Sequence, residues 1–233
     1  EFRFKAHTSR WVWGVAFNVG SLLTAFAQGV ILGSLVEGIP LHPGKYLHGA
    51  FAWFSPFAMM TGVAVVFGYA LLGATWLVLK TEGRLQRIAF DLTRPLMLVV
   101  IGFMLIVSAW LPFLDSALMA RWFTGTNFLY LSPVPILTAL NAALLWRAVL
   151  KDREVQPFVL SLCFFALGFI GLVLGMWPNI VPPDMSIWDA ASPPSSQGFV
   201  LVGAVFLIPA VLAYTVYSYR VFRGKVAADS GYH

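Results

Sequence analysis

The stretch PLMLVVIGFMLIVSAWLPFL, residues Pro95–Leu114, decides the fold class of this chain. It runs for 20 residues without a charged side chain. A helix needs about 20 mainly apolar residues to cross the hydrocarbon core of a bilayer. The opening proline suits the first turn of a helix, where the missing backbone N–H has no intrahelical partner in any case. The stretch therefore predicts a transmembrane helix that begins at Pro95.

Five further apolar stretches have the same character, so we expect about six transmembrane helices. They lie near residues 13–36, 51–79, 131–149, 157–177 and 198–219. The composition agrees, because 59% of the residues are hydrophobic and 11% are charged, against roughly 25% charged in soluble domains. The predicted fold class is all-α, a polytopic transmembrane helical bundle that forms a single domain over residues 1–233. Membrane lipid is the expected solvent of this bundle.

The basic residues predict the orientation of the helices. Thirteen of the 15 Lys and Arg residues fall at one set of span ends, and two fall at the other set. The larger group lies in residues 1–10, 80–94, 147–153 and 220–225. Cytoplasmic loops carry the excess of basic residues, so we expect loops at 80–94 and 150–156 and both chain ends to be cytoplasmic. This topology explains the net charge of +5 without a nucleic-acid partner.

Two Gly-x-x-x-Gly pairs mark where helices are expected to pack closely. Gly29 and Gly33 enclose the segment GVILG, and Gly171 and Gly175 enclose the similar segment GLVLG. Glycine has no side chain to keep two helix backbones apart in a membrane, so these four residues are the helix-packing candidates. The likeness of the segments has two interpretations, two related sub-bundles or chance similarity between apolar stretches, and both stay open.

Side chains that ligate haem or metal ions are scarce. Histidine is a common haem ligand, but His7, His42, His48 and His233 all lie in expected loops or tails. We therefore expect no catalytic residue, no cofactor ligand and no metal site in this chain. Glu37, just beyond the first span, has two interpretations: an acid of an ordinary solvated loop, or a proton or quinone group at the outer membrane boundary.

Uncharged polar residues occur within the spans. Asn18, Thr24, Gln28, Ser108 and Asn141 are the ones singled out here. Because lipid offers no hydrogen-bonding partner, each is expected to bond inside the bundle or beside another subunit. Hydrogen bonds between helices are the default expectation.

Several stretches resemble subunit II of cytochrome bd-type quinol oxidases. They are EFRFKA at 1–6, SLLTAFAQGVILG at 21–33, GIP at 38–40, GYALLGATWLVLKTEG at 68–83 and PNIVPPDMSIWDAASPPSSQ at 178–197. The stretch at 68–83 is the most specific, because it ends a long span and enters a basic segment as in that family. The likeness covers essentially the whole chain, and it is equally compatible with the cyanide-insensitive branch.

The resemblance implies a heterodimeric terminal oxidase of the bacterial inner membrane, which oxidises quinol and reduces oxygen to water. Haem b and haem d would belong to the partner, subunit I, and the reaction would contribute to the proton-motive force. Subunit II would support the haem subunit and the access of protons and oxygen. The family's N-terminal region, with its intramembrane acids, has no counterpart here, so we expect an N-terminally truncated fragment, the C-terminal two thirds of the subunit.

Two other functions remain open at this point. Six spans and an internal likeness are compatible with a small-solute transporter, although transporters usually contain broken helices or buried charges near the middle of the membrane. A structural membrane scaffold subunit is the other alternative. It differs from the oxidase subunit only in degree.

Overall fold

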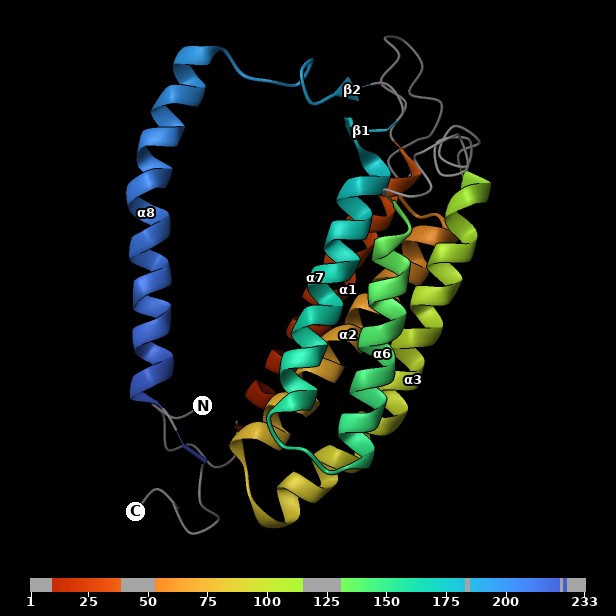
Figure 1. The fold of residues 1–233 in the computed structure, drawn as a ribbon, viewed down its shortest axis with the longest axis vertical. Helices are drawn as coiled ribbons and strands as arrows, with labels where there is room; N and C mark the ends of the chain where they lie inside the picture. Colours follow the sequence, from red (N-terminus) through yellow and green to blue (C-terminus); the bar gives the residue numbers. More distant parts are fainter. Residues whose placement is uncertain (1–9, 39–52, 115–130, 183–184, 223, 226–233) are drawn as a thin grey trace.

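Six long helices dominate the computed structural model, which describes residues 10–38, 53–114, 131–182, 185–222 and 224–225 (Figure 1). The helices are α1 (Arg10–Glu37), α2 (Pro56–Lys80), α3 (Gly83–Leu114), α6 (Pro133–Leu150), α7 (Gln156–Met176) and α8 (Pro194–Val221). Each is long and apolar enough to cross a membrane. The predicted all-α bundle of about six transmembrane helices is confirmed.

The second helix begins later than its apolar stretch predicts. α2 starts at Pro56, with Ser55 as its N-cap, rather than near residue 51. The Ser55 hydroxyl accepts a hydrogen bond of 2.9 Å from the backbone N–H of Ala58. A serine cap followed by proline is a favoured helix start. The apolar character of the residues before Ser55 hid this boundary.

The third helix begins earlier than predicted, at Gly83 instead of Pro95. The expected 80–94 loop is therefore wrong from Gly83 onward, and its arginines lie on a helix. Charged residues end a hydrophobic run, but Arg, Leu and Gln are good helix formers, so the helix continues beyond the apolar part. Gly83 itself has φ of +67°, which glycine adopts readily. This lets the chain turn directly from α2 into α3.

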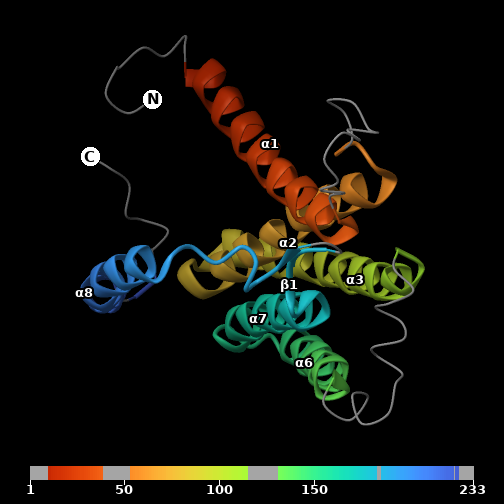
Figure 2. The ribbon, with the colours of Figure 1, turned by 90° about the horizontal axis from the view of Figure 1, so that it is seen from above.

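A single core joins four of the helices. Leu71 of α2, Met97 of α3, Leu145 of α6 and Phe164 of α7 are buried against one another. Figure 2 shows these four helices grouped together, with α1 leading away from α2 and α8 standing apart. The described helices therefore form a four-helix core that α1 and α8 flank.

Helix α8 contacts the rest of the described chain mainly near its C-terminal end. None of its residues is buried. The ammonium group of Lys80, at the end of α2, donates a hydrogen bond of 2.9 Å to the carbonyl of Phe222. The ring of Trp76 meets that of Tyr219 edge-on, with centroids 5.9 Å apart. These contacts attach the lower end of α8 in Figure 1 to the bundle.

An ion pair strengthens the same junction. The Lys225 ammonium lies 2.7 Å from Glu154, in the turn between α6 and α7. The side-chain hydrogen bond from Lys225, followed by that from Gln86, lowers the pKa of Glu154. The carboxylate is therefore ionised at neutral pH. Because its pKa is depressed on folding, the stabilisation exists above the ordinary value of 4.5 and is lost as the pH falls through the lowered value.

A short hairpin covers the opposite end of α7. Strands β1 (Asn179–Val181) and β2 (Met185–Ser186) pair in antiparallel fashion. The indole rings of Trp177 and Trp188 pack edge-on at 5.7 Å beside it. These strands were not predicted from the sequence, because two or three residues carry too little pattern to distinguish a strand from a loop.

The buried core predicts a strong dependence on side-chain volume. Leu145→Ala removes a fully buried side chain, and we expect it to lower the free energy of unfolding by about 2 kcal/mol, the lower end of the usual range. The loss of free energy is at the lower end of the range because lipid solvates a leucine side chain as well as a protein core does. Thermal unfolding in lipid nanodiscs measures it. Leu140→Ala, at a position 54% exposed on the same helix, is the control and should change little. An equal loss in both variants would contradict the four-helix core.

Candidate functional site

The closest approach between helix backbones around the predicted glycines lies in the seam between α1 and α2. A Cβ atom added to Gly29 would lie 2.5 Å from the carbonyl oxygen of Thr61 and 2.7 Å from the Cα of Gly62. A Cβ added to Gly33 would overlap the hydroxyl of Thr61 and lie 2.7 Å from the Cα of Ala58. Nothing larger than hydrogen fits at either position without movement of the backbone.

A hydrogen bond crosses the same seam. The Thr61 hydroxyl lies 2.9 Å from the carbonyl oxygen of Gly29 on α1 and 2.8 Å from that of Ala58 on its own helix. Thr61 is 8% exposed, so lipid barely reaches this bond. Gly62, opposite Gly29, is equally confined, since a Cβ there would lie 2.7 Å from the ring of Phe26. The sequence analysis did not single out Gly62, which belongs to no Gly-x-x-x-Gly pair.

The second glycine pair lies in different surroundings. A Cβ on Gly171 would come within 3.3 Å of a methyl group of Val134 on α6, and one on Gly175 would meet no described atom within 4 Å. Gly68 of α2 is tighter than either, because its Cβ would lie 2.7 Å from the ring of Phe165 on α7. The likeness of the two sequence segments therefore does not extend to their packing.

Glu37 is the last residue of α1 and lies beside the start of α2. It is partly buried, and its carboxylate accepts a hydrogen bond from the hydroxyl of Ser55. The same hydroxyl accepts from the N–H of Ala58, so Glu37 is linked through Ser55 to the first turn of α2. A negative charge near a helix N-terminus is stabilised by the helix dipole. The arrangement holds one acid at the boundary between the two helices.

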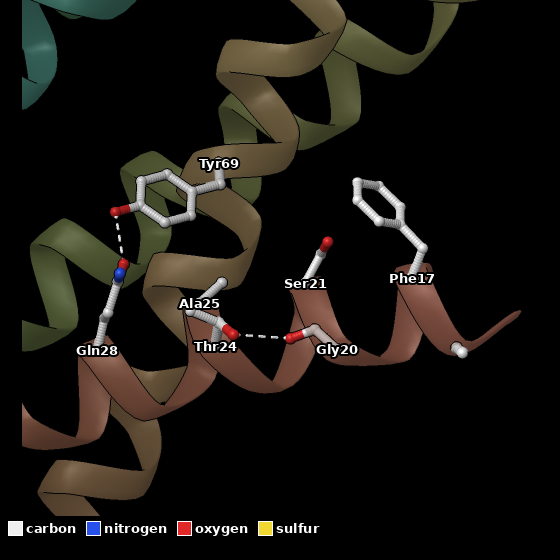
Figure 3. A pocket seen from close by; sticks show the side chains of 8 residues that line it. Phe17, Gly20, Ser21, Thr24, Ala25, Gln28 and Tyr69 are labelled. Carbon is white, nitrogen blue, oxygen red and sulfur yellow. Dashed lines mark hydrogen bonds between the residues drawn. The ribbon is translucent and has the colours of Figure 1, made fainter. Parts of the chain in front are cut away.

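An open groove follows the seam toward the start of α1, where α1 diverges from α2 (Figure 3). Its volume is about 520 Å³, and its lining includes Phe17, Thr24, Gln28 and Tyr69. The Tyr69 hydroxyl donates a hydrogen bond of 2.8 Å to the side-chain oxygen of Gln28. The Tyr69 ring stacks on that of Phe165, with centroids 6.0 Å apart. The groove thus combines apolar side chains with hydroxyl groups and with the hydrogen-bonded pair of Gln28 and Tyr69.

The other predicted polar residues behave in different ways. Asn141 donates a hydrogen bond of 3.0 Å from α6 to the carbonyl of Leu160 on α7, so an interhelical bond is confirmed there, as it is for Gln28. It is wrong for Thr24, whose hydroxyl donates to the carbonyl of Gly20 on its own helix. Asn18 and Ser108 are exposed, where a neighbouring subunit or lipid headgroup would have to reach them.

Ser161 is a buried polar residue that was not predicted from the sequence. Ser161 of α7 is fully buried, and its hydroxyl has no hydrogen-bonding partner among the described residues. A serine inside an apolar stretch gives no signal in the sequence that separates a paired hydroxyl from an unpaired one. Burial of an unpaired hydroxyl costs stability.

The described residues contain no group of three or more His, Cys, Asp or Glu side chains that could hold a metal ion. All four histidines fall outside the described ranges, so their surroundings are not known from the structure. Glu37 and the Gln28–Tyr69 pair are polar groups whose hydrogen bonds the described helices do define.

Comparison with known proteins identifies relatives. The family model described as cytochrome bd terminal oxidase subunit II matches residues 1–222. The chain is 25% identical over 264 residues to the probable cytochrome oxidase subunit 2 of Haemophilus influenzae, covering 98% of this chain and 70% of the relative. It is 23% identical over 272 residues to cytochrome bd-I ubiquinol oxidase subunit 2 of Escherichia coli, with the same coverage. It is 25% identical over 236 residues to cytochrome bd ubiquinol oxidase subunit 2 of Bacillus subtilis, covering 97% of this chain and 68% of the relative.

The seam predicts a difference between glycines on one helix. Gly33→Ala places a methyl group against the backbone of α2, and we expect a loss of about 1–3 kcal/mol, the usual cost of overpacking. Gly14→Ala is the matched control, because a Cβ at Gly14 meets no described atom within 4 Å. Thermal unfolding of both variants in nanodiscs measures the difference. Equal stability of the two would show that α1 does not pack on α2 through Gly33.

Proposed function

The chain belongs to the family of cytochrome bd terminal oxidase subunit II, and from this membership we propose that it is the subunit of a quinol oxidase that ligates no haem. The observation that carries the proposal is the family match over residues 1–222. The named relatives in Escherichia coli and Bacillus subtilis are subunits of ubiquinol oxidases. The proposed reaction transfers electrons from a quinol to oxygen, and oxygen takes up protons to become water.

Family membership supports the assignment of haem b and haem d to the partner, subunit I, where they would carry the electrons. Within this chain, the thioether of Met97 could ligate iron but is fully buried in the four-helix core. The four histidines lie outside the described residues. This chain would provide membrane-spanning support beside that subunit. The exposed faces of α1 and α8 offer the surface for subunit I and for lipid, and quinone is a further candidate for the groove at Tyr69.

We also propose that the chain is a multi-pass protein of the bacterial inner membrane with both ends cytoplasmic. Lys80, Arg94, Lys225 and the turn at Asp152 and Glu154 come together at one end of the bundle, as their hydrogen bonds and ion pairs require. An excess of basic residues at one side marks the cytoplasmic face. With this orientation, quinol oxidation would release protons outside and oxygen reduction would draw them from inside, which contributes to the proton-motive force.

The oxidase proposal predicts a haem-bearing partner. When the full-length protein is expressed with its neighbouring genes and purified by a tag on this subunit, a second subunit should copurify. The complex should show haem b and haem d absorption and quinol-dependent oxygen uptake. Deletion of this subunit is the control and should remove the uptake.

Failure of the copurified material to show haem d absorption or oxygen uptake would overturn the proposal. The transporter alternative makes the opposite prediction. Liposomes that contain this chain alone would then show solute flux, and a partner would be unnecessary. The scaffold alternative predicts that the partner retains full oxidase activity when this subunit is absent.

Within this function, we propose that Glu37 helps to pass protons at the outer membrane boundary. Its support is the hydrogen bond from Ser55, which holds the carboxylate at the junction of α1 and α2. Glu37→Gln should lower quinol-dependent oxygen uptake by about tenfold, less than the roughly 100-fold or more seen for a general acid or base at the reacting atoms. Glu82→Gln removes an exposed acid at the opposite end and is the control. Full activity of Glu37→Gln would make Glu37 an ordinary loop acid.

A further inference from the structure

The first turns of α3, residues 83–94, have a buried, an exposed apolar and a charged side, and the proposed function does not explain this arrangement. This segment precedes the apolar stretch that opens at Pro95 and presents both exposed apolar residues and exposed arginines. We propose that it lies in the membrane–water interface and binds the headgroups of anionic phospholipids. The proposal concerns lipid and does not depend on the oxidase activity.

One side of the segment is fixed against the bundle. Ala89 is 1% exposed and Thr93 is fully buried. In an α-helix each residue advances by about 100° around the axis, so these two residues lie about 40° apart on one face. Packing of this face prevents the segment from rotating about its axis. The directions of the remaining side chains are therefore set by the fold.

A second side is apolar and open. Leu85, Ile88 and Leu92 are 49%, 45% and 51% exposed. Their spacing places them in one stripe, within about 60° of each other around the axis. The stripe lies beside the buried face, so it is an outward continuation of the apolar side of the helix. Three exposed aliphatic side chains in a row are typical of a helix whose outer surface meets lipid rather than water.

A third side carries the charge. Arg84, Arg87 and Arg94 are exposed and lie within about 80° of each other, next to the apolar stripe. Asp91 shares this side. Arg94 lies 3.6 Å from Asp152, whereas Arg84 and Arg87 form no ion pair with another described residue. These two guanidinium groups are free to bind a phosphate, for which their planar donor geometry is well suited.

The membrane boundary falls where this charged side ends. On the same side of the helix, the exposed residues after Pro95 are apolar, and they include Leu98 and Leu105, which are 55% and 67% exposed. The change from arginine to leucine along one side locates the edge of the hydrocarbon near Pro95. At about 1.5 Å per residue, residues 83–94 reach about 18 Å beyond that edge if the helix stays upright.

An upright segment would place the apolar stripe in water. If the segment lies along the interface instead, the stripe meets the acyl chains and the arginines meet the headgroups, as in amphipathic interfacial helices. A proline within a helix permits such a change of direction. Figure 1 shows the start of α3 at the lower end of the bundle, below the other helices. Positive charge next to an apolar stripe selects anionic lipid over zwitterionic lipid.

The position of the segment is tested with single spin labels in the purified complex in nanodiscs. The labels are placed by Leu92→Cys and Asp91→Cys, neighbours on the apolar and the charged side. Both are made in a Cys163→Ser background, because Cys163 is an exposed free thiol. The Leu92 label should relax more with oxygen, which partitions into lipid, and the Asp91 label more with a water-soluble nickel chelate. Equal access of the chelate to both labels would overturn the interfacial position.

Lipid selectivity is tested with spin-labelled phosphatidylglycerol and phosphatidylcholine on the same complex. At roughly 1 kcal/mol per basic residue near the surface, each arginine is worth up to about fivefold in relative association. Arg84→Gln/Arg87→Gln should therefore lower the preference for phosphatidylglycerol by several-fold. Lys151→Gln/Arg153→Gln removes two exposed charges from the α6–α7 turn and is the matched control. Inorganic phosphate should compete no better than chloride at equal ionic strength.

Two results would overturn the assignment. An equal loss of preference in the two double variants would mean that only the net charge of this end attracts the lipid. Displacement of phosphatidylglycerol by inorganic phosphate but not by chloride would mean an anion site rather than a lipid surface.

Discussion

A membrane offers the backbone no hydrogen-bonding partner, and the rest of this structure depends on that constraint. Every N–H and C=O group in the hydrocarbon must bond within its own segment, which leaves helices as the spanning elements of a chain with this pattern. Polar side chains obey the same rule. Thr24 and Thr75, for example, donate their hydroxyl protons to carbonyls four residues earlier. The backbone hydrogen bonds of each helix therefore form within that helix and do not depend on its packing against the others.

This constraint explains why so much of the fold could be predicted from the sequence. Twenty uncharged residues from Pro95 to Leu114 require a helix whatever surrounds them, so the number and type of the elements follow from local pattern. The start of α3 at Gly83, in contrast, does not follow from the hydropathy pattern. The apolar stretch begins only after the arginines of residues 83–94, but the helix already includes them. Helix formation depends on backbone hydrogen bonds and propensity rather than on hydropathy. A hydropathy pattern predicts which part of a helix lies in lipid, but it does not predict the residues at which the helix begins and ends.

The site was less predictable, because packing is a property of two surfaces. The spacing of Gly29 and Gly33 predicts that a helix packs closely against them. The residues of α2 that they contact, Thr61 and Gly62, have no such spacing. Gly175 stands in the same spacing as Gly33, but a Cβ there would meet no described atom within 4 Å. A small residue makes close approach sterically feasible, and only the partner helix decides whether the approach occurs. For the same reason, Ser161 could not be distinguished from a paired serine before its neighbours were known.

Helix α8 is an example of a helix that forms without packing against the rest of the chain along most of its length. A water-soluble helix without a buried residue would be marginal, since most helical stability in soluble proteins comes from burying one face. In lipid, α8 is stable because its backbone bonds are shielded from water, and packing decides only where it stands. Its position is set at the water-exposed end, by the hydrogen bond from Lys80 and the ion pair between Lys225 and Glu154. The polar contacts that position the end of α8 and the carboxylate of Glu37 therefore lie at the ends of the helices, whereas the long apolar surface of α8 between its ends is exposed.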